Sequence, residues 1–131
     1  MVQGQRVNLV VPGDYPPHIQ VSPHLARLKP YGDLTLYADR PSSIEEQLER
    51  ARGAHVILNT QVSVKWFRDE LEQLPGLRMI STCSIGTDNI DLEAARELGI
   101  VVSNQPGKIA PYVAEHIIGL AFAVAKRAAY Q

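Results

Sequence analysis

The chain has 131 residues, 45% of them hydrophobic, which suits one soluble domain with a single apolar core. Its 13 basic and 14 acidic residues leave a net charge of −1 and are scattered, which argues against a nucleic-acid partner. The single cysteine excludes an intrachain disulfide. No signal peptide is visible and the longest apolar run, 117–125, falls short of the roughly 20 residues that cross a membrane, so we expect a cytoplasmic protein.

Five short, apolar, β-rich runs recur along the chain, and helical patterns fill most of the gaps between them. The runs lie at residues 7–11, 34–38, 55–59, 79–84 and 100–104. This alternation predicts a parallel sheet. The first and fourth runs are mostly apolar on both faces, as in central strands, whereas the second run alternates, as in an edge strand. The pattern therefore predicts an α/β fold with a flavodoxin-like, doubly wound, five-stranded parallel sheet in the order 2-1-3-4-5.

Start signals mark the predicted helices. Ser42 and Glu45 have the spacing of a capping box, and Ile44, Leu48 and Ala51 then fall on one predicted inner face. Asp91 is placed to cap a later helix. The pattern is weakest at residues 23–31, where only two leucines form an apolar stripe.

The last helix differs from the others because residues 117–125 are apolar on all sides. A helix with this pattern is buried on all sides. One face can pack on its own sheet, but the other requires a second domain or a second chain. The alternative is a well-covered helix within one domain. We expect an oligomer, and specifically a homodimer through this last helix.

Two loops at the carboxyl ends of the strands, where ligands of such sheets bind, have features of a site. Ser84, Ile85, Gly86 and Thr87 leave the fourth strand. Gly86 lets the backbone approach a ligand closely, and amides near a helix start favour an anion such as a carboxylate. A plain turn between strand and helix explains the same residues. The loop 104–112 is long and holds two prolines, which suits either a site or a structural connector.

Several familiar site motifs do not occur in the sequence. There is no Gly-x-Gly, and therefore no dinucleotide fingerprint, and the four histidines lack metal-ligand spacing, so no metal is predicted. Cys83 is interpreted as buried packing rather than as a nucleophile. Glu115 and His116 are adjacent on a helix, point in different directions and form no local acid–base pair. His18 lies in a loop at the ligand edge and is open to a binding role.

The segment SIGTDNIDLEAARELGIVVSNQPG, followed by VAEH, closely resembles the NAD-dependent D-isomer-specific 2-hydroxyacid dehydrogenases. The resemblance is strong over residues 77–127 and looser but collinear over 7–76. It implies that residues 1–131 form a substrate domain whose helix 112–130 connects to a Rossmann domain, which this chain does not contain. It also implies hydride transfer between NAD or NADP and a small 2-hydroxy or 2-keto acid.

The resemblance assigns roles to few residues of this chain. It implies that the backbone amides of Ile85 and Gly86, flanked by Ser84 and Thr87, hold the substrate carboxylate, and that Val113 lies near the nicotinamide. The family's catalytic arginine, glutamate and histidine, and its GxGxxG loop, belong further downstream. The resemblance therefore assigns no catalytic residue here, and a truncated chain of this kind is expected to be inactive alone, with no cofactor bound.

Two places depart from the family pattern. Ile109 stands where many relatives have asparagine, and residues 59–61 read Asn-Thr-Gln where some relatives place an arginine for a charged substrate. Both departures argue against a phosphorylated substrate. The alternative function is a stand-alone flavodoxin-like binding or dimerisation module. That alternative lacks a phosphoacceptor, because Asn59 occupies the position where an aspartate is needed.

Overall fold

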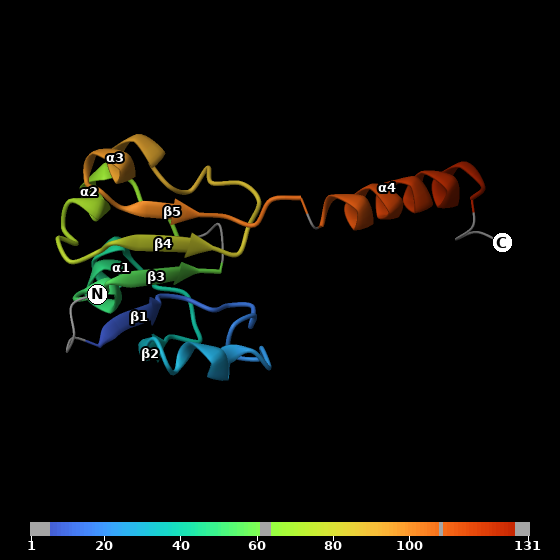
Figure 1. Ribbon diagram of the computed structural model, residues 1–131. Coiled ribbons are helices and arrows are strands. Elements are labelled where there is room, and N and C mark those ends of the chain that lie inside the picture. The colour runs from blue at the N-terminus through green and yellow to red at the C-terminus, as the bar shows by residue number, and fades with distance from the viewer. Residues whose placement is uncertain (1–5, 61–63, 108, 128–131) are drawn as a thin grey trace.

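The structure is a computed structural model that describes residues 6–60, 64–107 and 109–127. Five parallel strands form one sheet in the order β2-β1-β3-β4-β5, which confirms the predicted fold class and strand order (Figure 1). The strands are β1 (Val7–Val11), β2 (Gly32–Leu36), β3 (Val56–Asn59), β4 (Met79–Thr82) and β5 (Val101–Ser103). The second strand begins two residues earlier than its hydrophobic run predicts, because Gly32 already pairs with Val7.

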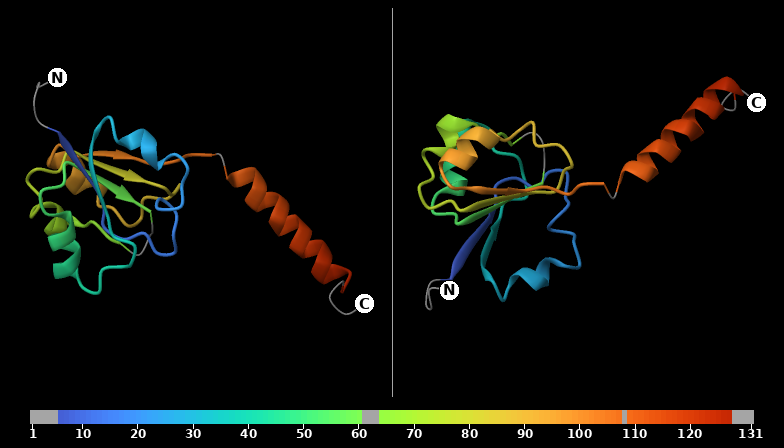
Figure 2. Two further views of the ribbon diagram at one scale, coloured as in Figure 1. Left: turned by 90° about the horizontal axis from the view of Figure 1, so that it is seen from below. Right: turned by 45° about the horizontal axis from the view of Figure 1, so that its top comes forward.

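The helices divide between the two faces of the sheet. Those on one face are α1 (Ile44–Ala51), α2 (Arg68–Leu71) and α3 (Leu92–Glu97), whereas the 3-10 helix η1 (Leu25–Leu28) lies on the other (Figure 2). The chain moves outward from β1 to β2 and then in the opposite direction from β3 to β5. Right-handed crossovers therefore place η1 opposite the three α-helices. The weak pattern at residues 23–31 yields only this single 3-10 turn.

The core lies between the sheet and the three α-helices. Its members are buried apolar side chains from both layers, among them Val10, Ile57, Ile80, Trp66, Leu71, Ala94 and Ala95. The opposite face of the sheet is less covered, since Leu58 is only half-buried and Val101 is 61% exposed. A parallel sheet usually has both faces covered. The η1 face is therefore the incomplete side of this chain.

The predicted inner face of α1 is confirmed at Ala51, which is buried, and at Leu48, which packs against the core, but it is wrong at Ile44. Ile44 is 56% exposed, and the side chains buried beneath the helix belong to Gln47, Arg50 and Ala51. The N-cap lies one residue later than predicted. Ser43, not Ser42, is the N-cap and accepts a hydrogen bond from the backbone N–H of Glu46 at 3.2 Å.

Glu46 also holds this helix start, but it binds Ser42, the residue before the N-cap, and so does not close a capping box with Ser43. Its carboxylate accepts hydrogen bonds from the backbone N–H and the hydroxyl of Ser42 and forms an ion pair with Arg50. Two overlapping Ser-x-x-Glu spacings exist in the sequence, and the ion pair with Arg50, one turn further along, selects the second. At the other predicted cap, Asp91 does cap α3 and accepts the N–H of Ala94 at 2.8 Å.

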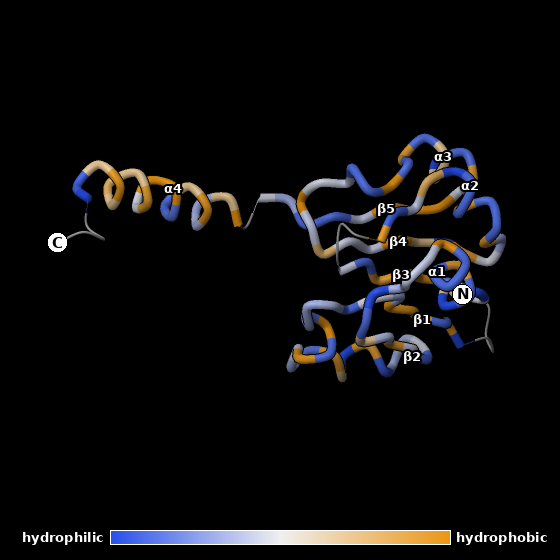
Figure 3. Tube along the Cα trace, turned by 180° about the vertical axis from the view of Figure 1, so that it is seen from behind, coloured by the Kyte–Doolittle hydropathy of each residue, from blue (hydrophilic) through white to orange (hydrophobic). Residues whose placement is uncertain are grey.

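The last helix, α4 (Ala110–Ala125), projects away from the sheet (Figure 1). It begins two residues before the predicted start, and the predicted end at 130 lies outside the described residues. All of its side chains are exposed, and apolar residues follow one another along its length (Figure 3). Within this chain α4 is thus neither packed on its own sheet nor covered by the domain. Among the described residues, no helix is long and apolar enough to cross a membrane.

The Glu46 capping interaction predicts a specific acid sensitivity. Hydrogen bonds from the Ser42 hydroxyl and N–H, together with the Arg50 guanidinium, lower the pKa of Glu46 to about 2. A carboxyl group with a lowered folded-state pKa stabilises the fold above its unfolded pKa, and this contribution is lost as pH falls toward the folded value. We expect Glu46→Gln to be less stable than wild type at pH 7 and the difference to vanish between about pH 4.5 and pH 2.

Urea denaturation midpoints across this pH range measure the difference. Glu49→Gln is the matched control, because Glu49 lies on the same helix and its one ion pair among the described residues is with the exposed Arg52. An exposed pair of this kind contributes little to stability. A Glu46→Gln deficit that persists unchanged at pH 2 would contradict the assignment.

Candidate functional site

In the loop that leaves β4, the four successive carbonyl oxygens of residues 84–87 all accept hydrogen bonds from within the protein. The Ser84 carbonyl accepts the N–H of Gln105 (3.0 Å), and the Ile85 carbonyl accepts the side-chain amide of Asn104 (2.7 Å). The Gly86 carbonyl accepts the Ser84 hydroxyl (2.6 Å), and the Thr87 carbonyl accepts the N–H of Ile90 (2.9 Å). The loop after β5 thus holds the loop after β4 from the side. The structure brings together the four residues that the sequence singled out and fixes the direction of their peptide groups.

The N–H groups of Ile85 and Gly86 have no hydrogen-bond partner within the described part of the chain. Both residues are exposed, Ile85 to 45%. Backbone N–H groups require a partner, and water or an anion supplies one when the protein does not. Two adjacent free N–H groups beside bonded carbonyls form a site of positive partial charge. The loop therefore has the polarity that suits a carboxylate.

The start of α3 does not contribute to this site in the way the sequence suggested. Asp91 already caps the helix, so a carboxylate of the protein occupies the helix start. Between the loop and the helix, Ile90 pairs with Trp66 in an isolated parallel bridge. The positive polarity beside the start of α3 is therefore carried by the loop N–H groups and not by the first N–H groups of the helix.

The backbone conformation at residue 86 does not require glycine, since its φ is not positive. A Cβ at this position would lie 3.0 Å from Oδ2 of Asp88, which is an exposed and flexible group. An added methyl group would therefore crowd the surface of the loop rather than unfold it. This makes Gly86 a suitable position for a substitution test.

Asp14, in the loop after β1, is an anchoring residue that sequence reasoning missed. Its fully buried carboxylate accepts backbone N–H groups from His18 (3.1 Å), Ile19 (3.0 Å) and Gln20 (2.8 Å). Burial opposes its ionisation, but these three donors outweigh burial and lower the pKa of Asp14. The Gly-Asp pair at the end of a strand was the signal that could have revealed this side-chain turn.

Other candidates from the sequence fall in different surroundings. The His18 ring contacts the carbonyl of Pro16, at 2.8 Å from Nδ1. Val113 lies in the first turn of α4 and is 50% exposed, with no hydrogen bond to the loop after β4. In the described ranges, no group of three or more His, Cys, Asp or Glu side chains is placed to hold a metal ion.

Cys83 is exposed, so its interpretation as a buried packing residue is wrong. It follows β4 directly and its N–H donates to the carbonyl of Asn59 at 2.9 Å. Partial burial of the sulfur, with a smaller contribution from the negative charge of Asp14, raises the pKa of the Cys83 thiol. At neutral pH the group is therefore a protonated thiol and a poor nucleophile.

Comparison with known proteins identifies the class. The sequence profile of the D-isomer specific 2-hydroxyacid dehydrogenase catalytic domain matches residues 19–129. Glyoxylate reductase of Thermofilum pendens is 35% identical over 118 residues, which are 88% of this chain and 34% of that protein. D-3-phosphoglycerate dehydrogenase of Methanocaldococcus jannaschii is 40% identical over 82 residues, which are 63% of this chain and 16% of that protein.

Solved structures give the same result. D-lactate dehydrogenase of Escherichia coli superimposes with a TM-score of 0.71 at 26% identity, covering 95% of this chain and 40% of that one. An acyclic imino acid reductase, solved with NADPH and D-Arg, superimposes with a TM-score of 0.77 at 25% identity, covering 90% of this chain and 37% of that one. The chain belongs to the D-isomer specific 2-hydroxyacid dehydrogenase family and spans about a third of the length of several of its relatives.

The proximity of Asp14 and Cys83 predicts a measurable coupling. Removing the Asp14 charge leaves the burial of the thiol in place, so we expect Asp14→Asn to lower the pKa of Cys83 while that pKa stays above its ordinary value. Cys83 is the only cysteine, so the pH dependence of iodoacetamide alkylation reports on it alone.

Asp33→Asn is the matched control, because Asp33 lies at the start of β2 and pairs with Arg6. Circular dichroism spectra of both variants verify that they fold. An unchanged or increased alkylation pKa in a folded Asp14→Asn variant would refute the coupling.

Proposed function

We propose that this domain binds the acid substrate of a NAD(P)-dependent oxidoreductase that interconverts 2-hydroxy and 2-keto acids. The substrate carboxylate accepts hydrogen bonds from the backbone N–H groups of Ile85 and Gly86, with Ser84 and Thr87 at either side. The observation that carries the proposal is the polarity of this loop, in which all four carbonyls are bonded and these two N–H groups have no partner among the described residues.

The role of this loop in the reaction is to orient the acid. A carboxylate held by two fixed N–H groups presents the adjacent carbon in a defined position, and positioning of this kind lowers the entropic part of the barrier. Fixed backbone dipoles also need no reorganisation during the reaction. Family membership and the names of relatives such as glyoxylate reductase support a small 2-keto acid as the substrate.

The cofactor belongs to the proposal for the whole protein. A structural relative was solved with NADPH, which supports NAD or NADP as the hydride carrier. The residues of this chain do not form a dinucleotide site by themselves, because the sequence contains no Gly-x-Gly. We propose that Val113 lies near the nicotinamide and that the last helix, predicted over 112–130, leads into the cofactor domain.

The second part of the proposal is a homodimer through α4. Its exposed large apolar side chains include Ile117, Ile118, Leu120, Phe122 and Val124, each more than half exposed. A continuous apolar surface of this kind is characteristic of a protein interface. A second copy that packs along α4 would cover these residues and form a closed, symmetric contact.

Ligand binding by the isolated chain tests the carboxylate site. In nitrogen-15-labelled protein, we expect millimolar glyoxylate to shift the backbone amide signals of Ile85 and Gly86, because the ligand becomes their hydrogen-bond acceptor. Gly86→Ala crowds the loop surface and is expected to weaken binding about tenfold, the factor that one charge-assisted hydrogen bond supplies.

Gly76→Ala is the matched control, because an added Cβ there meets only the carbonyl of Ala54 at 3.8 Å. It is expected to bind glyoxylate as the unaltered chain does. Amide shifts that avoid Ile85 and Gly86 at saturating glyoxylate would sink the proposed function. Equal binding by both glycine variants would show that the acid binds elsewhere.

Light scattering over a range of protein concentrations tests the dimer. We expect the unaltered chain to form a dimer. The double variant Ile118→Glu/Phe122→Glu is expected to be monomeric, because its dimer interface would have to bury two charges on one helix face. Ile44→Glu, which places a charge at an exposed apolar residue of α1, is expected to stay dimeric. A monomeric unaltered chain at high concentration would contradict the interface.

A further inference from the structure

A group of basic side chains lies at the amino ends of the strands, on the edge of the sheet opposite the carboxylate loop (Figure 1). Arg6, His55 and Arg78 immediately precede the first residues of β1, β3 and β4, respectively, and these strands are neighbours in the sheet. Together with Val7 they line a small cavity of about 20 Å³. The four residues of β4 put about 13 Å of strand between this cavity and the loop that holds Ser84. Nothing in the proposed function uses this cavity.

The sheet register places the three basic side chains on the same face. His55 is level with Asn8 of β1, to whose carbonyl its N–H donates at 2.9 Å. Arg78 is level with His55 in the same way, and its N–H donates to the His55 carbonyl at 2.9 Å. Side chains that are level on adjacent strands, or two residues apart on one strand, point to the same face of a sheet. Arg6, two residues before Asn8, therefore shares this face. Because β3 lies between β1 and β4, the imidazole stands between two arginines.

The imidazole ring of His55 is held in one orientation. The backbone N–H of Asn8 donates to Nδ1 of His55 at 3.0 Å, and the side-chain amide of Asn8 donates to the carbonyl of Gly53 at 3.0 Å. A ring nitrogen that accepts a hydrogen bond carries no proton, so the proton of the ring is on Nε2. Nε2 makes no hydrogen bond within the described part of the chain. His55 thus brings a fixed N–H donor to the lining of the cavity.

Both arginines keep unused hydrogen-bond donors. Arg78 makes no ion pair and no side-chain hydrogen bond among the described residues. Arg6 forms an ion pair with Asp33 at 3.0 Å, in which the two side chains are 68% and 62% exposed. An exposed pair of this kind is weak and leaves most of the five guanidinium donors unused. The lining itself contains no carboxylate, so the cavity is positive in character.

The size of the cavity and the arrangement of its donors fit a phosphoryl group. A cavity of about 20 Å³ admits one oxygen atom of the size of a water molecule. The other oxygens of a bound anion then lie outside it, within reach of two flexible guanidinium groups. Neighbouring strands are about 4.8 Å apart, so the donors approach from three separate positions. A tetrahedral phosphate presents an oxygen to each donor, whereas a planar carboxylate has only two oxygens.

We propose that Arg6, His55 and Arg78 form an anion site that binds a phosphoryl group, either of inorganic phosphate or of a phosphomonoester. The arginines bind the outer oxygens, and Nε2 of His55 donates to the oxygen in the cavity. The anion replaces Asp33 as the partner of Arg6. The site does not depend on the proposed function, because it lies at the other edge of the sheet. A ligand that joins the first residues of three strands stabilises the folded chain.

Titration of the nitrogen-15-labelled chain with inorganic phosphate, at an ionic strength held constant with chloride, tests the site. We expect millimolar phosphate to shift the backbone amide signals of Val7, His55 and Arg78 and the Nε2 signal of His55. Acetate is expected to bind there at least tenfold more weakly, because it has too few oxygens for the three donors. Arg78→Gln removes one charge-assisted hydrogen bond and is expected to weaken phosphate binding about tenfold.

Methyl phosphate distinguishes the two sources of the phosphoryl group. Binding as tight as that of inorganic phosphate would show that the site accepts phosphomonoesters, and binding at least tenfold weaker would restrict it to the free ion. Either result supports the anion site. Arg6→Gln, which alters another exposed side chain of the lining, is expected to lose affinity as Arg78→Gln does, so the test does not depend on one variant.

Arg52→Gln is the matched control, because Arg52 carries an equal charge close to His55 in the sequence but lies outside the lining and pairs with Glu49. It is expected to bind phosphate as the unaltered chain does, and circular dichroism spectra verify that all variants fold. Unshifted amides at saturating phosphate, equal binding of acetate, or an equal loss of affinity in Arg52→Gln would overturn the anion site. None of these outcomes bears on the carboxylate loop, which is tested separately with glyoxylate.

Discussion

Arg50 holds the carboxyl ends of β1 and β2 against α1, and the ligand edge of the sheet depends on this contact. The side chain is 8% exposed and donates to the carbonyls of Pro12 (2.9 Å) and Asp39 (3.0 Å). It also pairs with the carboxylates of Asp39 and Glu46 and lies over the Tyr37 ring at 4.7 Å. A planar guanidinium with five donors can satisfy this many acceptors at once, whereas a lysine cannot.

Side chains also bond to backbone groups in the rest of the loop after β1. Beyond Pro12, the carbonyl of Gly13 accepts the Thr60 hydroxyl at 2.9 Å, and the carboxylate of Asp14 then binds three successive N–H groups. The chain after β1 is thereby tied to the ends of β2 and β3. In the loop after β4, Asn104 fixes the carbonyl of Ile85 in the same manner. Inward-facing contacts thus determine which backbone groups of this edge are left for a ligand.

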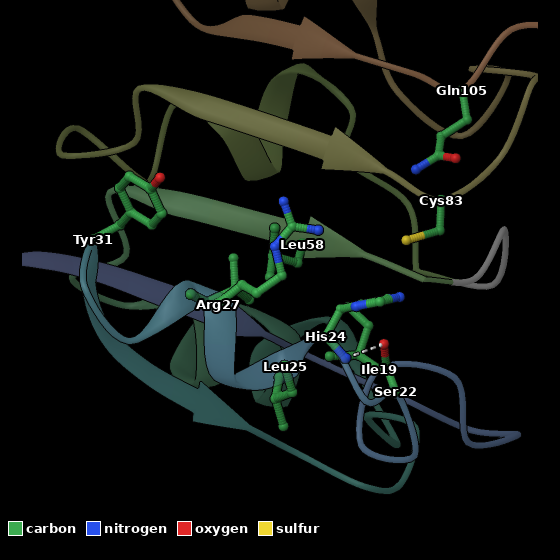
Figure 4. A pocket seen from close by; sticks show the side chains of 10 residues that line it. Ile19, Ser22, His24, Leu25, Arg27, Tyr31, Leu58, Cys83 and Gln105 are labelled. Atoms are coloured by element: carbon green, nitrogen blue, oxygen red, sulfur yellow. Dashed lines mark hydrogen bonds between the residues drawn. The ribbon is translucent and has the colours of Figure 1, made fainter.

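Two apolar surfaces of this chain are left open by the fold, and they differ in kind. The α4 surface is convex and continuous, which suits another helix or chain. The surface beneath η1 is a hollow whose lining combines apolar side chains with polar ones such as Ser22, His24 and Gln105 (Figure 4). The difference arises because η1 has a single turn and covers less of the sheet than α1, α2 and α3 cover on the opposite face.

Local patterns in the sequence were sufficient for the strands, their order, the Asp91 cap and the loop at Ser84–Thr87, because each depends on residues that are neighbours along the chain. The tertiary structure decided that Gln47 and Arg50, rather than Ile44, face inward on α1, since Arg50 finds its acceptors in Pro12 and Asp39. It also decided that the carbonyl of Ile85 is bonded to Asn104, while its N–H finds no partner in the part of the chain that the structure describes. Contacts between residues this far apart leave no periodic trace in the sequence, so only the folded chain reveals which of its polar groups are satisfied and which are available to bind.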